Sequence, residues 1–363
     1  MRPISSRWTL CLLLAATLCM VLLTSCLHHA DTPVPPPVTP APTFVGNAAC
    51  MSCHQEEFHQ QSHSRHAQTL HLASPQGLGN LAPPQGKIPG TDFVISLQDG
   101  QYAIASPSQS DEVAPLRYAL GSGKTGMTYA FPVPGGKLVE VRLSYFPAQK
   151  QWYITPGQEN LTPDVVGKVH PPADGQKCLL CHAVTIAPDS LKVETSFFGV
   201  GCESCHGPGS AHVAAMRKGD TNSIAMENLA QRPASRLNAL CGNCHGTIGD
   251  SEAAKRMRNA TNRFQAFGLM QSQCYQQSND TLSCITCHNP HADASTNLKT
   301  YEAVCLNCHS TVTKPLTQPA VVGKPCPVNP KSQCIGCHMP SQQAIPNTSL
   351  PTFMADHFIR IHR

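Results

Sequence analysis

The chain has 363 residues, with 19 Cys, 18 His and 32 Pro but only 13% charged and 6% aromatic residues. A formal net charge of +4 without a basic block argues against a nucleic-acid surface, so no nucleic-acid partner is expected. Low charge with 41% hydrophobic residues excludes simple disorder, and the length excludes a small disulfide scaffold.

The N-terminal segment has the pattern of an export signal. Two arginines precede an apolar stretch over residues 8–23, and small residues follow it. The stretch is shorter than a comfortable membrane span, and a retained N-terminal anchor is the alternative interpretation. The sequence LTSC resembles a bacterial lipoprotein cleavage box, which implies a lipoprotein-type signal peptide over residues 1–25 and a lipidated Cys26 that holds the protein on a membrane surface.

A proline-rich segment follows the signal. Residues 26–43 contain six prolines, a composition that predicts a semi-rigid tether rather than a domain. We therefore expect the folded body to begin near Phe44. It is expected to be exported and lipid-anchored to a bacterial membrane, facing the periplasm or the cell exterior.

One motif, C-x-x-C-H, occurs seven times beyond the tether. Two thiols at this spacing add to the two vinyl groups of a haem, and the adjacent His then binds the iron as its proximal ligand. The two intervening residues need no special chemistry. The alternatives are zinc ribbons, which do not demand a His after every second Cys, and a disulfide array, for which two residues between partners is an unusual spacing.

The motifs thus predict seven covalently bound haem c groups. The predicted thioether cysteines are Cys50, Cys53, Cys178, Cys181, Cys202, Cys205, Cys241, Cys244, Cys284, Cys287, Cys305, Cys308, Cys334 and Cys337. The predicted proximal iron ligands are His54, His182, His206, His245, His288, His309 and His338.

Nine further His lie beyond the tether, enough for bis-His ligation of all seven irons. A Gly/Pro-rich turn allows His212 to reach a neighbouring haem, and His291 lies too close to its own motif to serve the same iron. In the His-rich region 59–71, His59, His63 and His66 share one face of a helix, and only one or two His are needed there. The others are surface residues or neighbours of haem propionates. The predicted distal ligands are His66, His71, His170, His212, His291 and His357.

The spacing of the motifs predicts how the body is organised. His54 and His182 are 128 residues apart, whereas later gaps are 21 to 43 residues. The long gap contains β-rich runs with glycine turns, which predict a small antiparallel sheet inserted over residues 91–160, after a first haem segment at 44–90. In the six-haem region, 161–363, short helices are expected beside the motifs, most clearly over about 251–272.

The expected fold is a multihaem cytochrome c, haem-cored, with mostly short α-helices, irregular loops and a small antiparallel β-rich insertion. Few aromatic residues are available, so seven macrocycles are expected to supply much of the apolar interior. Two cysteines remain, Cys274 and Cys326; one disulfide and two free buried thiols are both open.

The chain resembles a known family over most of residues 50–360, and residues 284–291 and 334–340 look like segments of related multihaem cytochromes. Residues 50–69 are similar to the signature of the cytochrome c554 family, and residues 201–212 resemble a CESCHGPG segment of the same wider group. That group includes multihaem nitrite reductases and hydroxylamine oxidoreductases. The chain departs from the nitrite reductases because it has no C-x-x-C-K motif, and from the hydroxylamine oxidoreductases because it has seven motifs rather than eight and no matched cross-linking Tyr.

Electron transfer is the expected function, because saturated, closely spaced haems suit it. The expected partners are redox proteins, either membrane quinol-oxidising or terminal reductase components. The alternative is a multihaem oxidoreductase that acts on nitrite or hydroxylamine at one five-coordinate haem. A subunit of a larger respiratory assembly is a third possibility.

Overall fold

The computed structural model describes the chain in seven ranges. Contacts divide the chain into a unit of residues 1–42 and a unit of residues 43–363. The predicted signal peptide and most of the tether lie outside the described residues. Within the described ranges, every helix lacks the length or the apolar character needed to cross a bilayer. The described residues are 41–106, 113–187, 189–222, 224–246, 262–310, 323–346 and 348–362.

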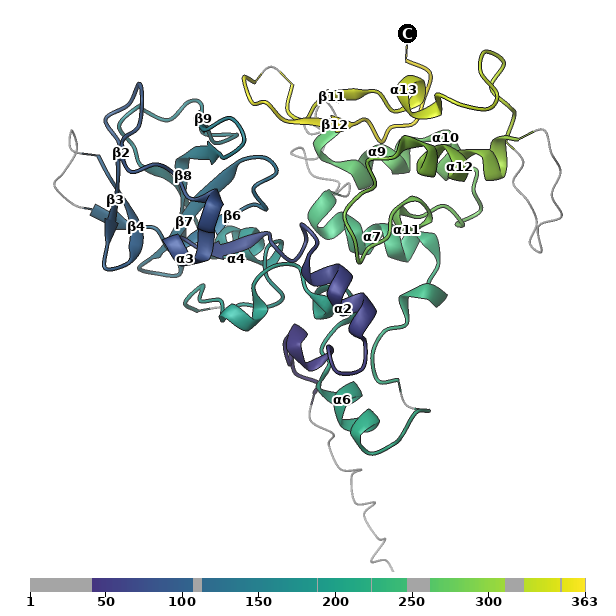
Figure 1. Ribbon diagram of the computed structural model, residues 1–363, viewed down its shortest axis with the longest axis horizontal. Helices are drawn as coiled ribbons and strands as arrows, with labels where there is room; N and C mark the ends of the chain where they lie inside the picture. The colour runs from purple at the N-terminus through teal and green to yellow at the C-terminus, as the bar shows by residue number, and fades with distance from the viewer. Residues whose placement is uncertain are drawn as a thin grey trace, which may run out of the picture. The chain divides into compact units, whose positions relative to one another are not determined.

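Short helices dominate the described chain from residue 171 to residue 338 (Figure 1). This agrees with the expected short helices beside the motifs. The α-helices are α2 (Gln55–Ser62), α3 (Pro75–Leu78), α4 (Pro172–Leu180), α5 (Cys202–His206), α6 (Ser210–Arg217), α7 (Ala234–His245), α9 (Gln265–Gln271), α10 (Gln273–Gln276), α11 (Cys284–Cys287), α12 (Leu298–His309) and α13 (Cys334–His338). Single 3-10 turns are η1 (Asn47–Ala49), η2 (Gly79–Leu81), η3 (Thr195–Phe197) and η4 (Leu229–Gln231).

The strands form antiparallel sheets. A six-stranded sheet has the order β1-β6-β7-β8-β10, with β9 also pairing β8, and a four-stranded sheet has the order β2-β3-β4-β5. A third sheet pairs β11 with β12. The strands are β1 (Leu70–Leu72), β2 (Gly86–Lys87), β3 (Val94–Gln98), β4 (Gln101–Ala105), β5 (Val113–Pro115), β6 (Tyr118–Leu120), β7 (Met127–Val133), β8 (Lys137–Phe146), β9 (Gln151–Ile154), β10 (Gly167–His170), β11 (Ser341–Gln343) and β12 (Phe353–Ala355).

The β-rich runs of the sequence become β3, β4, β7, β8 and β9. Asp99 and Gly100 join β3 to β4 with positive φ angles of 50° and 77°, the backbone of a two-residue hairpin turn. The strands begin earlier and end later than the predicted insertion at 91–160: β1 starts at Leu70 and β10 ends at His170. These two short strands were missed because three or four residues carry too little periodicity.

The helix predicted over about 251–272 is found only in its last part. Residues 247–261 lie outside the described ranges, and the described helix α9 begins at Gln265. Phe264 has φ −111° and ψ 76°, which is not helical, so no helix continues through it.

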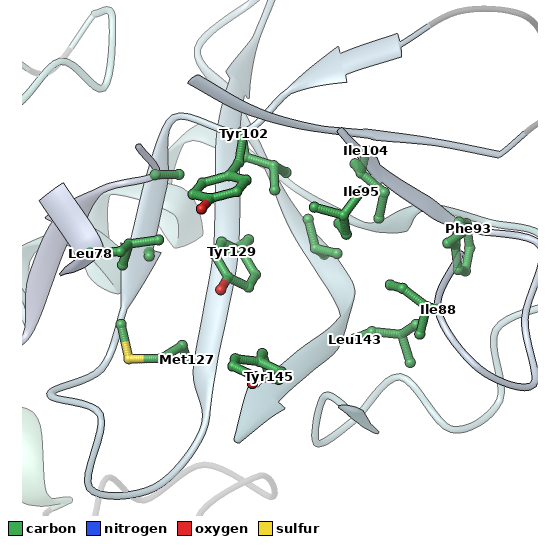
Figure 2. Packing of buried hydrophobic residues seen from close by; sticks show 14 residues of the cluster. Leu78, Ile88, Phe93, Ile95, Tyr102, Ile104, Met127, Tyr129, Leu143 and Tyr145 are labelled. Atoms are coloured by element: carbon green, nitrogen blue, oxygen red, sulfur yellow. The ribbon is translucent and has the colours of Figure 1, made fainter. Parts of the chain in front are cut away.

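Two apolar clusters lie in and beside the sheets. The first joins both large sheets and contains Tyr102, Tyr129 and Tyr145, whose rings form a column in Figure 2. The second contains Tyr118 of β6 and Leu179 of α4, and therefore fixes the second motif against the six-stranded sheet. Among the described residues, neither cluster includes one beyond Phe198. Buried apolar side chains in the later described residues are Ala234, Leu237, Ala266, Phe267, Leu269, Ala344 and Leu350.

The two most buried tyrosines provide a matched test of hydrogen bonding. Tyr118 and Tyr129 both have 0% exposure. The Tyr118 hydroxyl donates to Leu191 O (2.9 Å) and accepts from Val193 N (3.0 Å), whereas the Tyr129 hydroxyl has no hydrogen-bond partner among the described residues.

We predict opposite effects for the two Tyr→Phe variants. Tyr129→Phe removes an unsatisfied buried hydroxyl and should leave the free energy of unfolding unchanged or raise it by about 1 kcal/mol. Tyr118→Phe leaves Val193 N–H and Leu191 C=O without their partner and should lower it by about 1–3 kcal/mol. Denaturant unfolding of the haem-loaded protein measures both. Equal destabilisation by the two variants would contradict the prediction.

Candidate haem-binding site

The seven motifs lie at or beside short helices. Motifs three, five and seven form α5, α11 and α13; motifs four and six end α7 and α12. The second motif starts within α4, and the first directly precedes α2. A helical turn brings residues three apart onto one side, so the two thiols of each motif point the same way.

Apolar residues inside the motifs are exposed in the polypeptide alone. Met51 is 50%, Leu180 48% and Ile285 38% exposed. A haem attached to the neighbouring thiols would lie beside these side chains. The donor set of each motif, two cysteines and an adjacent imidazole, is the chemistry that haem c attachment needs.

Four motif His face a second imidazole contributed by a different part of the chain. A metal–imidazole bond is about 2 Å long and the ring centre lies about 1 Å further away, so two ligands on opposite sides of one metal have ring centres roughly 6 Å apart. The observed spacings match this value. The facing pairs are His54–His212 (6.3 Å), His206–His291 (6.3 Å), His245–His66 (5.9 Å) and His288–His357 (6.2 Å).

Backbone carbonyls orient most of the ligand rings. A carbonyl oxygen only accepts hydrogen bonds, so a ring whose Nδ1 contacts it carries the proton there and keeps a lone pair on Nε2 for the iron. The Nδ1 contacts of motif His are His182–Thr69 O (2.8 Å), His206–Glu227 O (3.2 Å), His309–Lys324 O (2.9 Å) and His338–Arg360 O (3.1 Å). The distal rings do the same in His212–Ile224 O (2.6 Å) and His357–Ala355 O (2.9 Å).

Burial also favours the neutral form that metal binding requires. Desolvation is the main cause that lowers the pKa of His66, His288, His291 and His357, and also of His182. For His66 and His291, the facing imidazole of His245 or His206 lowers the pKa further, because two neighbouring positive charges repel each other.

His66 is held in place by a close approach of two chain segments. Val200 N–H donates to His66 O (2.8 Å). The preceding Gly199 has φ +78°, and a Cβ there would lie 2.0 Å from Ala67 O, so only glycine allows this approach. The contact fixes the segment from which His66 reaches His245.

Three polar residues that sequence reasoning missed position the motif helices. Glu203 is 2% exposed and its carboxylate accepts backbone N–H groups of Val45, Gly46 and Gly209 at 2.7–3.1 Å. Glu203 therefore has a structural role that the spacing of the haem motif does not require. The CESCHGPG segment, with the glycine turn that follows Glu203, is the sequence signal for it.

Asn47 and Asn238 act in the same way on two other motif segments. Asn47 Oδ1 accepts Cys202 N–H (2.9 Å), and Asn238 Oδ1 accepts Cys284 N–H (2.9 Å). Each binds the first N–H of a motif helix that would otherwise lack a partner. Their partners are 155 and 46 residues away, so the sequence could not reveal them.

Two predicted distal ligands have other roles in the structure. His71 lies on β1, and its ring nitrogens contact Gly77 O (3.1 Å) and Gln68 O (2.8 Å), which leaves neither directed at an iron. His170 lies on β10, and its Nε2 contacts Glu140 Oε2 at 3.0 Å. Both ring nitrogens of His71 are thus engaged within the protein, whereas His170 remains a predicted ligand that the structure does not pair with a second imidazole among the described residues. In the described residues, His182, His309 and His338 have no ring contact with a second imidazole.

The cysteines are unbonded, as thioether formation requires. All sixteen Cys in the described ranges are free, including Cys274 and Cys326. The possible disulfide between those two is therefore absent: electrostatic interactions place Cys274 beside Cys287 and Cys308, and Cys326 beside Cys334. In the described ranges, no three His, Cys, Asp or Glu side chains are grouped to hold a metal ion by themselves.

Thiols of different motifs interact with one another. In the polypeptide without haem, a hydrogen bond joins the thiols of Cys50 and Cys202, and another joins those of Cys181 and Cys244. A third bond joins Cys241 to Cys284. These contacts place the first motif beside the third, the second beside the fourth, and the fourth beside the fifth.

Family models match two segments of the chain. Residues 157–207 match "Cytochrome c554 and c-prime", and residues 278–314 match "Doubled CXXCH motif". Each segment contains two of the seven motifs. The matches confirm the resemblance to cytochrome c554 and support haem c binding through C-x-x-C-H motifs. No curated protein matches the chain.

Two solved structures are similar to the chain. The outer cell wall cytochrome OcwA has a TM-score of 0.48 and 14% identity, covering 87% of this chain and 79% of that one. The undecahaem cytochrome from the S-layer of Carboxydothermus ferrireducens has a TM-score of 0.40 and 19% identity, covering 76% of this chain and 44% of that one.

The facing imidazoles predict the effect of removing one distal ligand. In the haem-loaded protein, replacing His66, His212, His291 or His357 with Ala should convert one low-spin haem to high-spin, because that iron loses its second nitrogen ligand. His71→Ala is the control and should leave the spin state of every haem unchanged. Electron paramagnetic resonance (EPR) with haem quantification measures both. A high-spin haem in His71→Ala, or none in the four variants, would contradict the assignment.

Proposed function

We propose that the chain is an exported seven-haem c-type cytochrome that transfers electrons between membrane-associated donors and periplasmic or extracellular acceptors. The observation that carries the proposal is the set of four facing imidazole pairs, each with ring centres 5.9–6.3 Å apart. Bound haem c supplies an iron that gains and loses one electron reversibly. The two imidazoles of each pair would hold such an iron from both sides and leave no position for a substrate, which would suit electron transfer.

The order of neighbouring motifs supports a continuous path. Cys205 lies near enough to Cys241, and Cys305 to Cys287 and Cys334, for their thiols to interact electrostatically in the polypeptide without haem. Together with the hydrogen-bonded pairs of thiols, this proximity gives a series of neighbouring motifs in the order one, three, four, five, six, seven. The second motif joins this series as a branch at the fourth. Each haem would therefore have at least one close neighbour.

An oxidoreductase that converts nitrite or hydroxylamine is the alternative function. It requires an iron with one open axial position and acid–base groups beside it. The second motif is the candidate for such a site, because two acid–base groups lie near it. Glu140, which contacts His170 at 3.0 Å, is close enough to Cys178 to interact with its thiol electrostatically. Electron transfer is the preferred function because four complete pairs are positive observations.

A spectroscopic experiment separates the two functions. We expect the oxidised, haem-loaded protein to contain seven haems and to show mainly low-spin ferric EPR signals that nitrite, hydroxylamine and cyanide leave unchanged. The reduced protein should be reoxidised by a soluble one-electron acceptor in single-turnover mixing. A high-spin signal that shifts on adding nitrite or hydroxylamine, with turnover of that compound, would replace electron transfer by the alternative.

Membrane attachment is proposed from the N-terminal sequence. The tether would hold the haem-bearing body near membrane quinol-oxidising or terminal reductase components, which are the proposed partners. A lipid on Cys26 would provide the anchor.

Replacing the anchoring residue tests this part of the proposal. Cys26→Ala should move the protein from the membrane fraction to the soluble exported fraction without changing its haem content. Cys19→Ala, which lies inside the apolar stretch, is the control and should remain with the membrane. If Cys26→Ala stays in the membrane fraction and is uncleaved, the segment is a retained anchor rather than a lipoprotein signal.

A further inference from the structure

Helix α2 carries two His that take no part in the facing imidazole pairs. His59 and His63 are four residues apart on α2 and its C-cap, so they lie on one helical face. Both are exposed, and their ring centres are 4.5 Å apart with the planes inclined by 37°. This spacing is shorter than that of the four facing pairs, where a macrocycle must fit between the rings.

The His63 ring is held in the form that binds a metal. Its Nδ1 lies 2.7 Å from His59 O, the carbonyl one helical turn earlier. Since a carbonyl only accepts, Nδ1 carries the proton and Nε2 keeps its lone pair. Within the described chain, neither Nε2 of His63 nor either ring nitrogen of His59 makes a hydrogen bond. Two imidazoles therefore stand side by side with nitrogens open to solvent.

We propose that His59 and His63 form a chelating site for a divalent transition-metal ion of the Cu²⁺, Ni²⁺ or Zn²⁺ class. Imidazole nitrogen suits these ions, whereas Ca²⁺ and Mg²⁺ prefer oxygen ligands. The protein supplies two ligands, and water completes the coordination. The carboxylate of Glu56, one turn before His59 and bonded to Gln60 Nε2 (3.3 Å), adds negative charge to this face.

One feature of the helix favours binding, and another locates the site. The hydrogen bond of His63 Nδ1 to His59 O fixes one ring before the ion arrives, which reduces the entropy lost on chelation. The helix also begins directly after His54 of the first motif. His59 is five residues further on, so at the helical rise the site lies about 8 Å along the axis from the first haem-binding motif. The site itself does not depend on the proposed electron-transfer function.

Titration of the haem-loaded protein with Ni²⁺ tests the site. The free thiols Cys274 and Cys326 are alkylated in every sample, since thiolates also bind such ions. We expect one tight site in the wild type by isothermal titration calorimetry. His59→Gln and His63→Gln should each weaken it at least about tenfold, because the chelate loses one of its two anchoring points. His71→Gln, another His near α2, is the matched control and should bind as the wild type does.

A second measurement uses the unaltered protein, in case a variant fails to fold. Diethylpyrocarbonate modifies free imidazoles, and peptide mass spectrometry locates the modified residues. Ni²⁺ should protect His59 and His63 together. Unchanged affinity in both variants, an equal loss of affinity in His71→Gln, or no protection by Ni²⁺ would overturn the proposal.

The metal site and the electron-transfer function can fail separately. Seven low-spin haems without a Ni²⁺ site would overturn this inference alone. Ni²⁺ binding together with a high-spin haem that responds to nitrite or hydroxylamine would overturn only the electron-transfer function.

Discussion

The haem-binding site depends on the orientation of imidazole rings by distant backbone carbonyls. Thr69 O orients His182, and Arg360 O orients His338. His66 likewise bonds to the backbone at Pro290. Each of these carbonyls is far along the chain from the His whose ring it orients. The rings can therefore be oriented for iron binding only after separate parts of the chain have come together. Folding and axial ligation are therefore expected to be coupled, as they are for metal-nucleated domains.

The distribution of apolar side chains points to the same coupling. Both apolar clusters belong to the sheets and the second motif, and none of their members lies beyond Phe198. The later motifs nevertheless follow one another at intervals of 21 to 43 residues. Short helices such as α11 (Cys284–Cys287) bury too little surface to be stable alone. The described part of the later region therefore combines many motifs with few buried apolar side chains.

Local patterns allowed the motifs, the turn at Asp99–Gly100 and the main strands to be predicted, because spacing and turn chemistry act over a few residues. Tertiary contacts decided the rest. His66 and His71 were both predicted as ligands, with His66 favoured by the family resemblance. Pairing with β6 places His71 in a sheet, where both ring nitrogens contact carbonyls. Glu203 was treated as a spacer, yet it holds residues 45 and 46 against the third motif from more than 150 positions away. Cys274 and Cys326 stayed apart because each lies beside a different motif.

The sheet explains why the order of neighbouring motifs differs from their order along the chain. Motifs two and three are separated by only 24 residues, yet the Cys181 thiol of motif two bonds to Cys244 of motif four. Leu179, within motif two, is completely buried in the cluster that includes β6 and β8 residues. Motif two is thus fixed by the sheet on one side and meets motif four on the other. The chain then returns through Val200 to the segment of His66, and motif three joins motif one through Cys202 and Cys50. The long insertion before motif two consequently supplies the sheet against which this motif packs.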